Sequence, residues 1–220
     1  AASDVYKRQG LLILSEDEIY RVARQALAAG FQVNTHAIGD RANRVVLNAY
    51  ERAFREFPNV RDHRFRIEHA QILDEADIPR LARLGVIASM QAIHATSDMP
   101  WVPARIGEAR AREGAYVWRK LLDSGARIAN GSDAPVEPVN PLLGFYAAIT
   151  RQDEHGNPPG GWYPDQRMTR EEALRSFTRD AAYAAFEEQV EGSLEPGKLA
   201  DLVVLSRDIM TIPPLEILRT

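Results

Sequence analysis

The chain has 220 residues, and its 27 lysines and arginines against 31 aspartates and glutamates give a formal net charge of −4. A hydrophobic share of 45% and a charged share of 26% are typical of a globular domain and exclude long disordered or low-complexity segments. The absence of cysteine excludes a disulfide framework, a thiolate zinc site and a cysteine nucleophile.

Charge and hydropathy also limit the partners. The isoelectric point is near 5.8 and no basic stripe is present, so we expect no nucleic-acid partner. The apolar run at residues 11–14 is far shorter than the ~20 residues of a spanning helix, so we expect no membrane partner. We therefore expect a cytoplasmic protein with a small-molecule substrate. The sequence leaves its oligomeric state open and, since the chain has no initiator methionine, also leaves open a signal peptide.

The first nine residues (AASDVYKRQ) differ from the remainder of the chain. They show no periodicity that continues beyond residue 9. We interpret residues 1–9 as a non-native leader and leave them out of the fold argument.

Helical and strand patterns alternate from residue 15 onward. Ser15 and Glu18 form an S-x-x-E capping box, which predicts a helix that ends at Gly30. The apolar residues at helical spacing are Ile19, Val22, Ala23, Ala26 and Leu27. A strand is predicted over residues 31–36, a helix from Asp40 to Pro58, and a strand over residues 65–69.

The alternation continues downstream. Asp74 is predicted to cap a helix that ends at Gly85, and a strand follows over residues 86–91. The stretch with Pro100 and Pro103 is predicted to be irregular. A helix is then predicted near residues 115–122 and a strand over residues 127–131.

The pattern changes after residue 133. Helices are predicted over residues 142–150 and after the T-x-x-E box of Thr169 and Glu172, with a Gly-, Pro- and Trp-rich loop over residues 152–167 between them. A turn-rich segment at residues 192–198 precedes a β run at residues 202–205. We expect this end of the chain to enter a separate small β domain.

Alternating strands and helices predict an α/β fold with a parallel sheet. Polar residues follow the strands at their carboxyl ends, namely His36, His69, Gln91 and Asp133. That end carries the active site in a βα barrel and the ligand in an open doubly wound sheet, so position alone does not choose between them. Four units are too few for a closed barrel of eight strands, and the lone Gly39 is a poor match to a dinucleotide-binding loop.

Two imidazoles and one carboxylate in this pattern suggest a metal site. His36, His69 and Asp133 carry ligand types that zinc and similar divalent ions prefer. Such an ion would lower the pKa of a bound water toward about 7, and the carboxylate would take its proton and pass it to a leaving amine. The structural alternative is that the histidines are hydrogen-bonded strand ends and that Asp133 is a turn or cap residue.

The remaining histidines and two tryptophans carry weaker signals. His63 and His155 lie in polar loops, where we expect solvent exposure. His94 follows a strand closely, so it faces a substrate or has a structural role. Trp101 and Trp162 are expected to pack beneath long loops.

Five ordered blocks resemble one family. They are residues 35–42 (THAIGDRA), 66–71 (RIEHAQ), 89–94 (SMQAIH), 131–137 (GSDAPVE) and 192–202 (GSLEPGKLADL). Together they resemble the C-terminal part of the amidohydrolase family 3 (YtcJ-like) metal-dependent hydrolases, over roughly residues 11–220.

The resemblance implies a fold, a cofactor and a reaction. The fold would be the C-terminal half of a (β/α)8 barrel, with its fifth to eighth strands in residues 10–190, and residues 191–220 would form part of a composite β-sandwich. His36, His69 and Asp133 would be ligands of one or two divalent ions, of zinc type, and Asp133 would also shuttle the proton. From their positions in the sequence, rather than from the resemblance, we also expect Arg41, Gln91 and His94 to contact the substrate. Metal-bound hydroxide would attack a carbon–nitrogen bond other than a peptide, in an amide or an N-acyl or N-formyl group.

One feature of the family is missing from this sequence. The family carries an H-x-H pair on its first strand and a metal-bridging residue on its fourth, and these 220 residues contain no H-x-H. We therefore expect the chain alone to bind metal weakly and to be inactive. A metal-dependent ester or lactone hydrolase and a non-catalytic small-molecule binding module are the alternatives.

Overall fold

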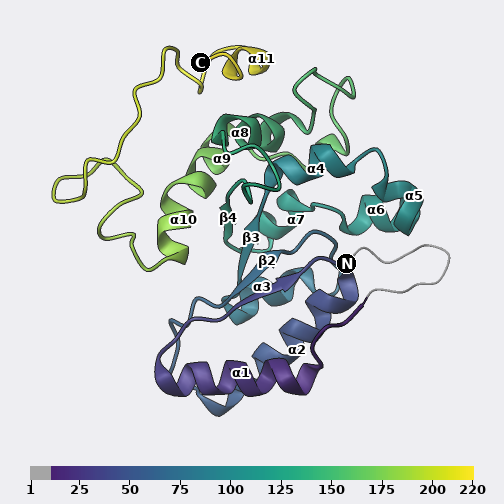
Figure 1. The fold of residues 1–220 in the computed structure, drawn as a ribbon, viewed down its shortest axis with the longest axis vertical. Helices are drawn as coiled ribbons and strands as arrows, with labels where there is room; N and C mark the ends of the chain where they lie inside the picture. Colours follow the sequence, from purple (N-terminus) through teal and green to yellow (C-terminus); the bar gives the residue numbers. More distant parts are fainter. Residues whose placement is uncertain (1–10) are drawn as a thin grey trace. The chain divides into compact units, whose positions relative to one another are not determined.

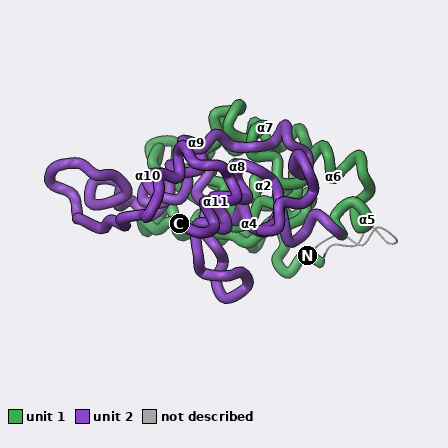
Figure 2. The backbone as a smooth tube through the Cα atoms, turned by 90° about the horizontal axis from the view of Figure 1, so that it is seen from above, with its two compact units in different colours: residues 1–90, 101–127 green, residues 91–100, 128–220 purple. Residues whose placement is uncertain are grey.

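The computed structural model describes residues 11–220 (Figure 1). The predicted leader, residues 1–9, lies outside the described residues. The chain divides into two compact units (Figure 2). Among the described residues, unit 1 consists of residues 11–90 and 101–127, and unit 2 consists of residues 91–100 and 128–220.

Unit 1 contains a parallel sheet. Its strands are β1 (Asn34–Ala37), β2 (Arg66–His69) and β3 (Ile87–Met90), with β2 in the middle. Its helices are α1 (Glu16–Ala29), α2 (Asp40–Glu56), α3 (Ile78–Leu84), α5 (Val102–Ile106), α6 (Glu108–Gly114) and α7 (Trp118–Asp123). Helices that follow strands and a sheet that is parallel confirm the predicted α/β class.

Helix α1 begins and ends as its sequence predicts. The Glu18 amide donates to Ser15 Oγ at 3.3 Å, and the Ser15 amide donates to Glu18 Oε2 at 2.8 Å. Gly30 ends the helix at a φ of +74°, which glycine adopts without a Cβ clash. The expected apolar face is wrong at Val22, which is 50% exposed. The buried residues of α1 are spaced every four positions, so they form a single narrow stripe (Ile19, Ala23 and Leu27).

Helix α2 packs against α1 and covers the sheet of unit 1 (Figure 1). Tyr50 of α2 is fully buried, and its hydroxyl lies 2.5 Å from Thr35 Oγ1 of β1. Burial raises the pKa of this phenol above its ordinary value, so it stays neutral. The amphipathic pattern of α2 thereby fixes the strand that carries His36.

Two expectations in unit 1 are wrong. Helix α3 begins at Ile78 rather than after Asp74, whose Oδ1 instead accepts the Ala76 amide at 3.0 Å in a local turn. The stretch expected to be irregular contains α5 and α6 here, and α4 in unit 2. Pro103 does not prevent α5, because it lies in the first turn, where a helix needs no amide donor.

Unit 2 is mostly helical. Its elements are α4 (Ala92–Asp98), β4 (Ile128–Asn130), α8 (Pro141–Thr150), η1 (Pro164–Gln166), α9 (Arg170–Phe177), α10 (Arg179–Ala184) and α11 (Pro214–Ile217). Helix α8 packs against α4, α9 and α11. The capping box expected at Thr169 and Glu172 is confirmed, with amide-to-side-chain distances of 3.2 and 2.7 Å.

The β run expected at residues 202–205 is not a strand in the structure. Leu202, Val203 and Val204 are 56%, 81% and 87% exposed. An apolar β-prone run forms a strand only when another strand accepts its hydrogen bonds, and this segment is assigned to no sheet. Within residues 11–220, no helix combines the length and the apolar character that crossing a bilayer demands.

Candidate metal and catalytic residues

His36 and His69 lie next to each other in unit 1. His36 is on β1 and His69 ends β2, and their ring centroids are 4.4 Å apart in an edge-to-face arrangement with an interplanar angle of 70°. His36 is exposed and His69 is half-buried. The sequence expectation that these two imidazoles meet at the carboxyl ends of neighbouring strands agrees with this geometry.

The backbone of His69 explains how the two rings meet. His36 is paired in register with Glu68, and Ala37 with His69, so a regular β2 would send the His69 side chain to the face opposite His36. His69 instead has a φ of +79°, and Ala70 a φ of +45°. This left-handed conformation turns the His69 side chain toward His36 at the point where the strand ends. Such strain in a residue other than glycine is typical of functional sites.

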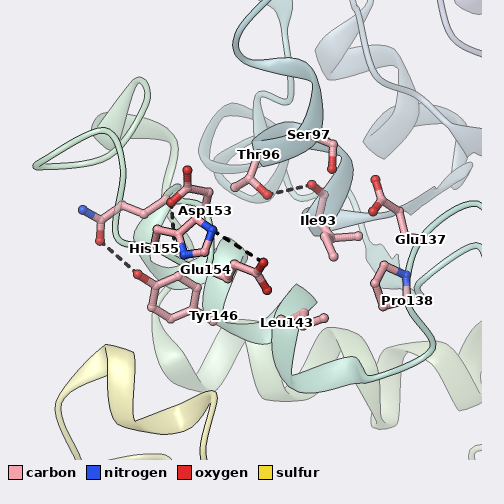
Figure 3. A pocket seen from close by; sticks show the side chains of 11 residues that line it. Ile93, Thr96, Ser97, Glu137, Pro138, Leu143, Tyr146, Asp153, Glu154 and His155 are labelled. Carbon is pink, nitrogen blue, oxygen red and sulfur yellow. Dashed lines mark hydrogen bonds and ion pairs between the residues drawn. The ribbon is translucent and has the colours of Figure 1, made fainter.

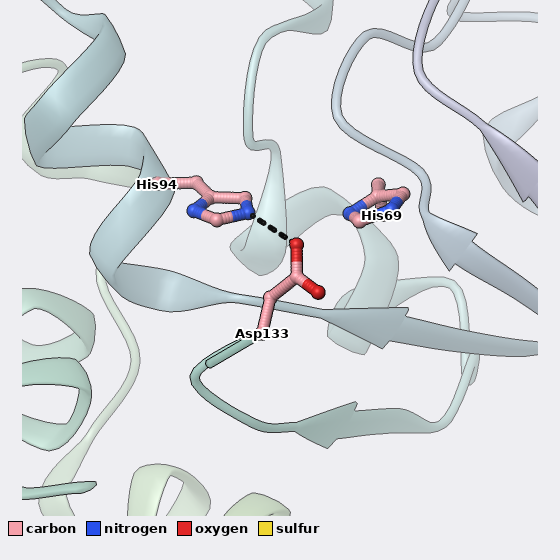
Figure 4. Close-up of side chains that lie close together, drawn as sticks. All are labelled: His69, His94 and Asp133. Carbon is pink, nitrogen blue, oxygen red and sulfur yellow. Dashed lines mark hydrogen bonds and ion pairs between the residues drawn. The ribbon is translucent and has the colours of Figure 1, made fainter. Parts of the chain in front are cut away.

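Asp133 lies in unit 2, in the loop that follows β4. It also has a left-handed backbone, with a φ of +59°. Its Oδ2 is 3.4 Å from Nε2 of His94, which is on α4 (Figure 4). The Asp133 side chain is 37% exposed, whereas that of His94 is only 9% exposed. The carboxylate is therefore accessible on one side and held by a buried imidazole on the other.

Glu137 also contacts His94, and it was not singled out in the sequence analysis. Its Oε1 is 3.2 Å from Nδ1 of His94, so the imidazole lies between two carboxylates. The only sequence signal was its place at the end of the GSDAPVE block. His69, His94 and Asp133 offer donor atoms of the kind that binds a divalent ion.

Unit 2 also contains an open pocket of about 310 Å³ (Figure 3). Its lining comes from α4, the loop after β4, α8 and residues 152–155. Glu137 belongs both to this lining and to the His94 cluster. Carboxylates predominate among the charged lining residues, with Glu137, Asp153 and Glu154 beside His155.

The two other predicted contact residues differ in accessibility. Arg41 is exposed in the first turn of α2, and its amide donates to Asp40 Oδ1 at 2.8 Å. Gln91 is buried at the start of α4, where its carbonyl accepts the His94 amide at 3.1 Å.

The expectations for the two loop histidines and the two tryptophans are confirmed in part. His63 is not solvated as expected, because its ring stacks on Phe54 with centroids 3.8 Å apart. His155 is exposed as expected. Trp162 packs beneath the guanidinium of Arg151, 5.2 Å from its ring centroid, whereas Trp101 is 39% exposed.

The chain is similar to known proteins. The chain matches the model of the Amidohydrolase family over residues 1–220. It is 35% identical, over 208 residues, to the putative amidohydrolase YtcJ of Bacillus subtilis strain 168, a match that covers 94% of this chain and 38% of the relative. It is 32% identical, over 220 residues, to the N-substituted formamide deformylase of Arthrobacter pascens, covering 96% of this chain and 39% of the relative.

A solved structure is also similar. The crystal structure of an uncharacterized metal-dependent hydrolase from Pyrococcus furiosus matches with a TM-score of 0.77 and 33% identity, over 92% of this chain and 39% of that one. The chain thus spans about two fifths of the length of these proteins.

Proposed function

Because this chain belongs to the amidohydrolase family, as the five sequence blocks indicated, we propose that it is part of a metal-dependent hydrolase. The bond cleaved is a carbon–nitrogen bond other than a peptide, in an amide or an N-acyl or N-formyl group. The neighbouring imidazoles of His36 and His69 are the observation that carries this proposal. Similarity to a protein named N-substituted formamide deformylase supports the bond type.

We also propose that the chain forms half of a barrel and part of a second domain. Residues 10–190 would supply the fifth to eighth strands of a (β/α)8 barrel, and residues 191–220 would join a composite β-sandwich. The parallel order of β1, β2 and β3 supports the barrel. So does the position of the histidines at the carboxyl ends of β1 and β2, where such barrels place their active sites.

His36, His69 and Asp133 are proposed to hold one or two divalent ions, with zinc as the proposed metal. Two imidazoles and a carboxylate are a donor set that suits zinc, and the left-handed backbones of His69 and Asp133 are the kind of strain that functional sites retain. When bound, the metal supplies a Lewis acid that makes a water acidic enough to ionise near neutral pH.

The protein's own groups then handle the proton and the substrate. Asp133 accepts the proton from the attacking water and returns it to the leaving amine. His94 contacts one oxygen of that carboxylate, and the pocket lined by α4, α8 and residues 152–155 receives part of the substrate. Arg41, Gln91 and His94 are proposed as further substrate contacts.

The 220 residues by themselves are proposed to bind metal weakly and to lack turnover. They span about two fifths of the similar proteins and contain no H-x-H pair. Zinc titration of this chain beside the full-length protein tests the point. Tight stoichiometric binding together with amide hydrolysis by the chain alone would refute it.

Asp133→Asn in the full-length protein tests the proposed function. Asparagine keeps the shape of the side chain and tolerates a left-handed backbone, but it cannot act as the proton acceptor. We expect kcat on an N-formyl amine to fall by about 10²–10⁴-fold with unchanged thermal stability. The matched control, Asp201→Asn, removes an exposed carboxylate and should leave kcat unchanged.

Substrate profiles separate the alternatives. An Asp133→Asn variant with the activity of the wild type would contradict the proposed role and favour a binding module. A panel of amides and esters measured with the wild type identifies the bond, and preference for esters or lactones would overturn the amide assignment.

A further inference from the structure

Glu137 approaches His94 from the side opposite Asp133. The Val136 amide donates to the Asp133 carbonyl at 2.8 Å, and this turn brings Glu137 back toward α4. Its side chain is only 14% exposed, and its Oε1 lies 3.2 Å from His94 Nδ1. The same turn therefore presents two carboxylates to the two nitrogens of one imidazole.

The main chain of His94 is held by a separate buried network. Asn130, the last residue of β4, accepts the Ala92 amide on its Oδ1 at 3.1 Å. Its Nδ2 donates to Ser176 Oγ of α9 at 2.8 Å. The start of α4 is thus anchored to the strand that leads to Asp133, so the backbone of His94 is fixed and its remaining freedom is rotation of the ring.

We propose that Glu137 is a positioning residue that sets this rotation. Its contact with Nδ1 of His94 keeps Nε2 of the same ring directed at Asp133 Oδ2. The other oxygen of Asp133 is then available for the proposed chemistry (Figure 4). The inference rests on the proposed function, since it assigns to Glu137 an effect exerted through Asp133. Groups that orient the residues of a metal site in this way change metal affinity or activity by about 10–100-fold when removed.

Glu137→Ala and Glu137→Gln in the full-length protein test the role. We expect Glu137→Ala to lower kcat by about 10–100-fold and to weaken zinc affinity by about 10-fold or more, with KM little changed. Glutamine keeps the length of the side chain, and its amide can donate to Nδ1 or accept from it, so Glu137→Gln should restore most of both losses. The control Glu171→Gln alters an exposed glutamate in the first turn of α9 and should match the wild type.

Stability measurements guard against a folding defect. If Glu137→Ala lowers the melting temperature, Glu137→Met, which keeps the chain length without a strong acceptor, replaces it in the comparison with glutamine. Loss of kcat in Glu137→Met together with recovery in Glu137→Gln supports positioning by the hydrogen bond.

The outcomes separate this inference from the proposed function. Full activity and zinc affinity in Glu137→Ala, alongside an inactive Asp133→Asn, would overturn the inference alone. A higher KM with unchanged kcat would make Glu137 a substrate contact and would also overturn it. Full activity in Asp133→Asn would overturn the proposed function, and with it the inference that rests on it.

Discussion

The end of β2 in unit 1 and the end of β4 in unit 2 both carry a candidate ligand, and they position it by different means. His69 is aimed by its backbone, whose φ of +79° turns the ring toward His36. Asp133 also has a left-handed backbone, but its carboxylate is held by His94, which is held in turn by Glu137. Strain therefore directs one residue and a chain of polar contacts directs the other.

This difference has an energetic consequence. Aspartate visits the left-handed region more readily than most residues, because its short polar side chain bonds locally. A histidine has no such short side chain, and the left-handed conformation costs it roughly 1 kcal/mol relative to glycine. The β2 end thus carries a larger stability cost than the β4 end.

Replacing His69 by glycine and by alanine tests the strain at the end of β2. Both changes remove the imidazole, but only glycine adopts the positive φ freely. We expect His69→Gly to have a free energy of unfolding about 1 kcal/mol higher than His69→Ala. Urea unfolding of the full-length protein measures the difference.

A neighbouring position supplies the control with the opposite sign. Ala37 pairs with His69 in the sheet and has a negative φ, as strand residues normally do. Ala37→Gly should therefore lower the free energy of unfolding by about 0.5–1 kcal/mol. Equal stability of the glycine and alanine variants at His69 would show that the left-handed backbone stores no strain.

The sequence predicts the helices and strands of the two units better than it predicts the contacts between side chains. The capping boxes at Ser15 and Thr169 predicted two helix starts, because their signals lie within one turn. The contact between Glu137 and His94 joins residues 43 positions apart, which no local pattern reveals. Strand alternation would have placed His69 opposite His36, so the left-handed backbone that brings them together was not predictable.

The expectation for His63 failed for a related reason. Its flanking residues, Asp62 and Arg64, are polar and suggested solvent. Long-range packing instead stacks the ring on Phe54 of α2, and the Phe65 amide donates to its Nδ1 at 3.1 Å. His63 precedes β2 and is held by packing, whereas His69 ends β2 and is held by its backbone conformation.

The packing of His63 predicts that the stability of the protein depends on pH. Burial lowers the pKa of His63 below its ordinary value, against the opposing effects of a hydrogen bond to Leu84 and the charge of Asp62. The folded protein therefore binds fewer protons at this ring than the unfolded chain. Its contribution to stability is complete above the unfolded pKa of about 6.5 and declines as the pH falls through that value toward the lower folded pKa.

His63→Phe keeps the stack on Phe54 but cannot titrate, so it should flatten the dependence of unfolding free energy between about pH 5 and 7.5. It should also lower stability at neutral pH by about 1 kcal/mol, because the Phe65 amide loses its acceptor. The control His155→Phe alters an exposed histidine and should preserve the slope of the wild type. An unchanged slope in His63→Phe would show that packing beside β2 leaves the protonation of this ring as it is in the unfolded chain.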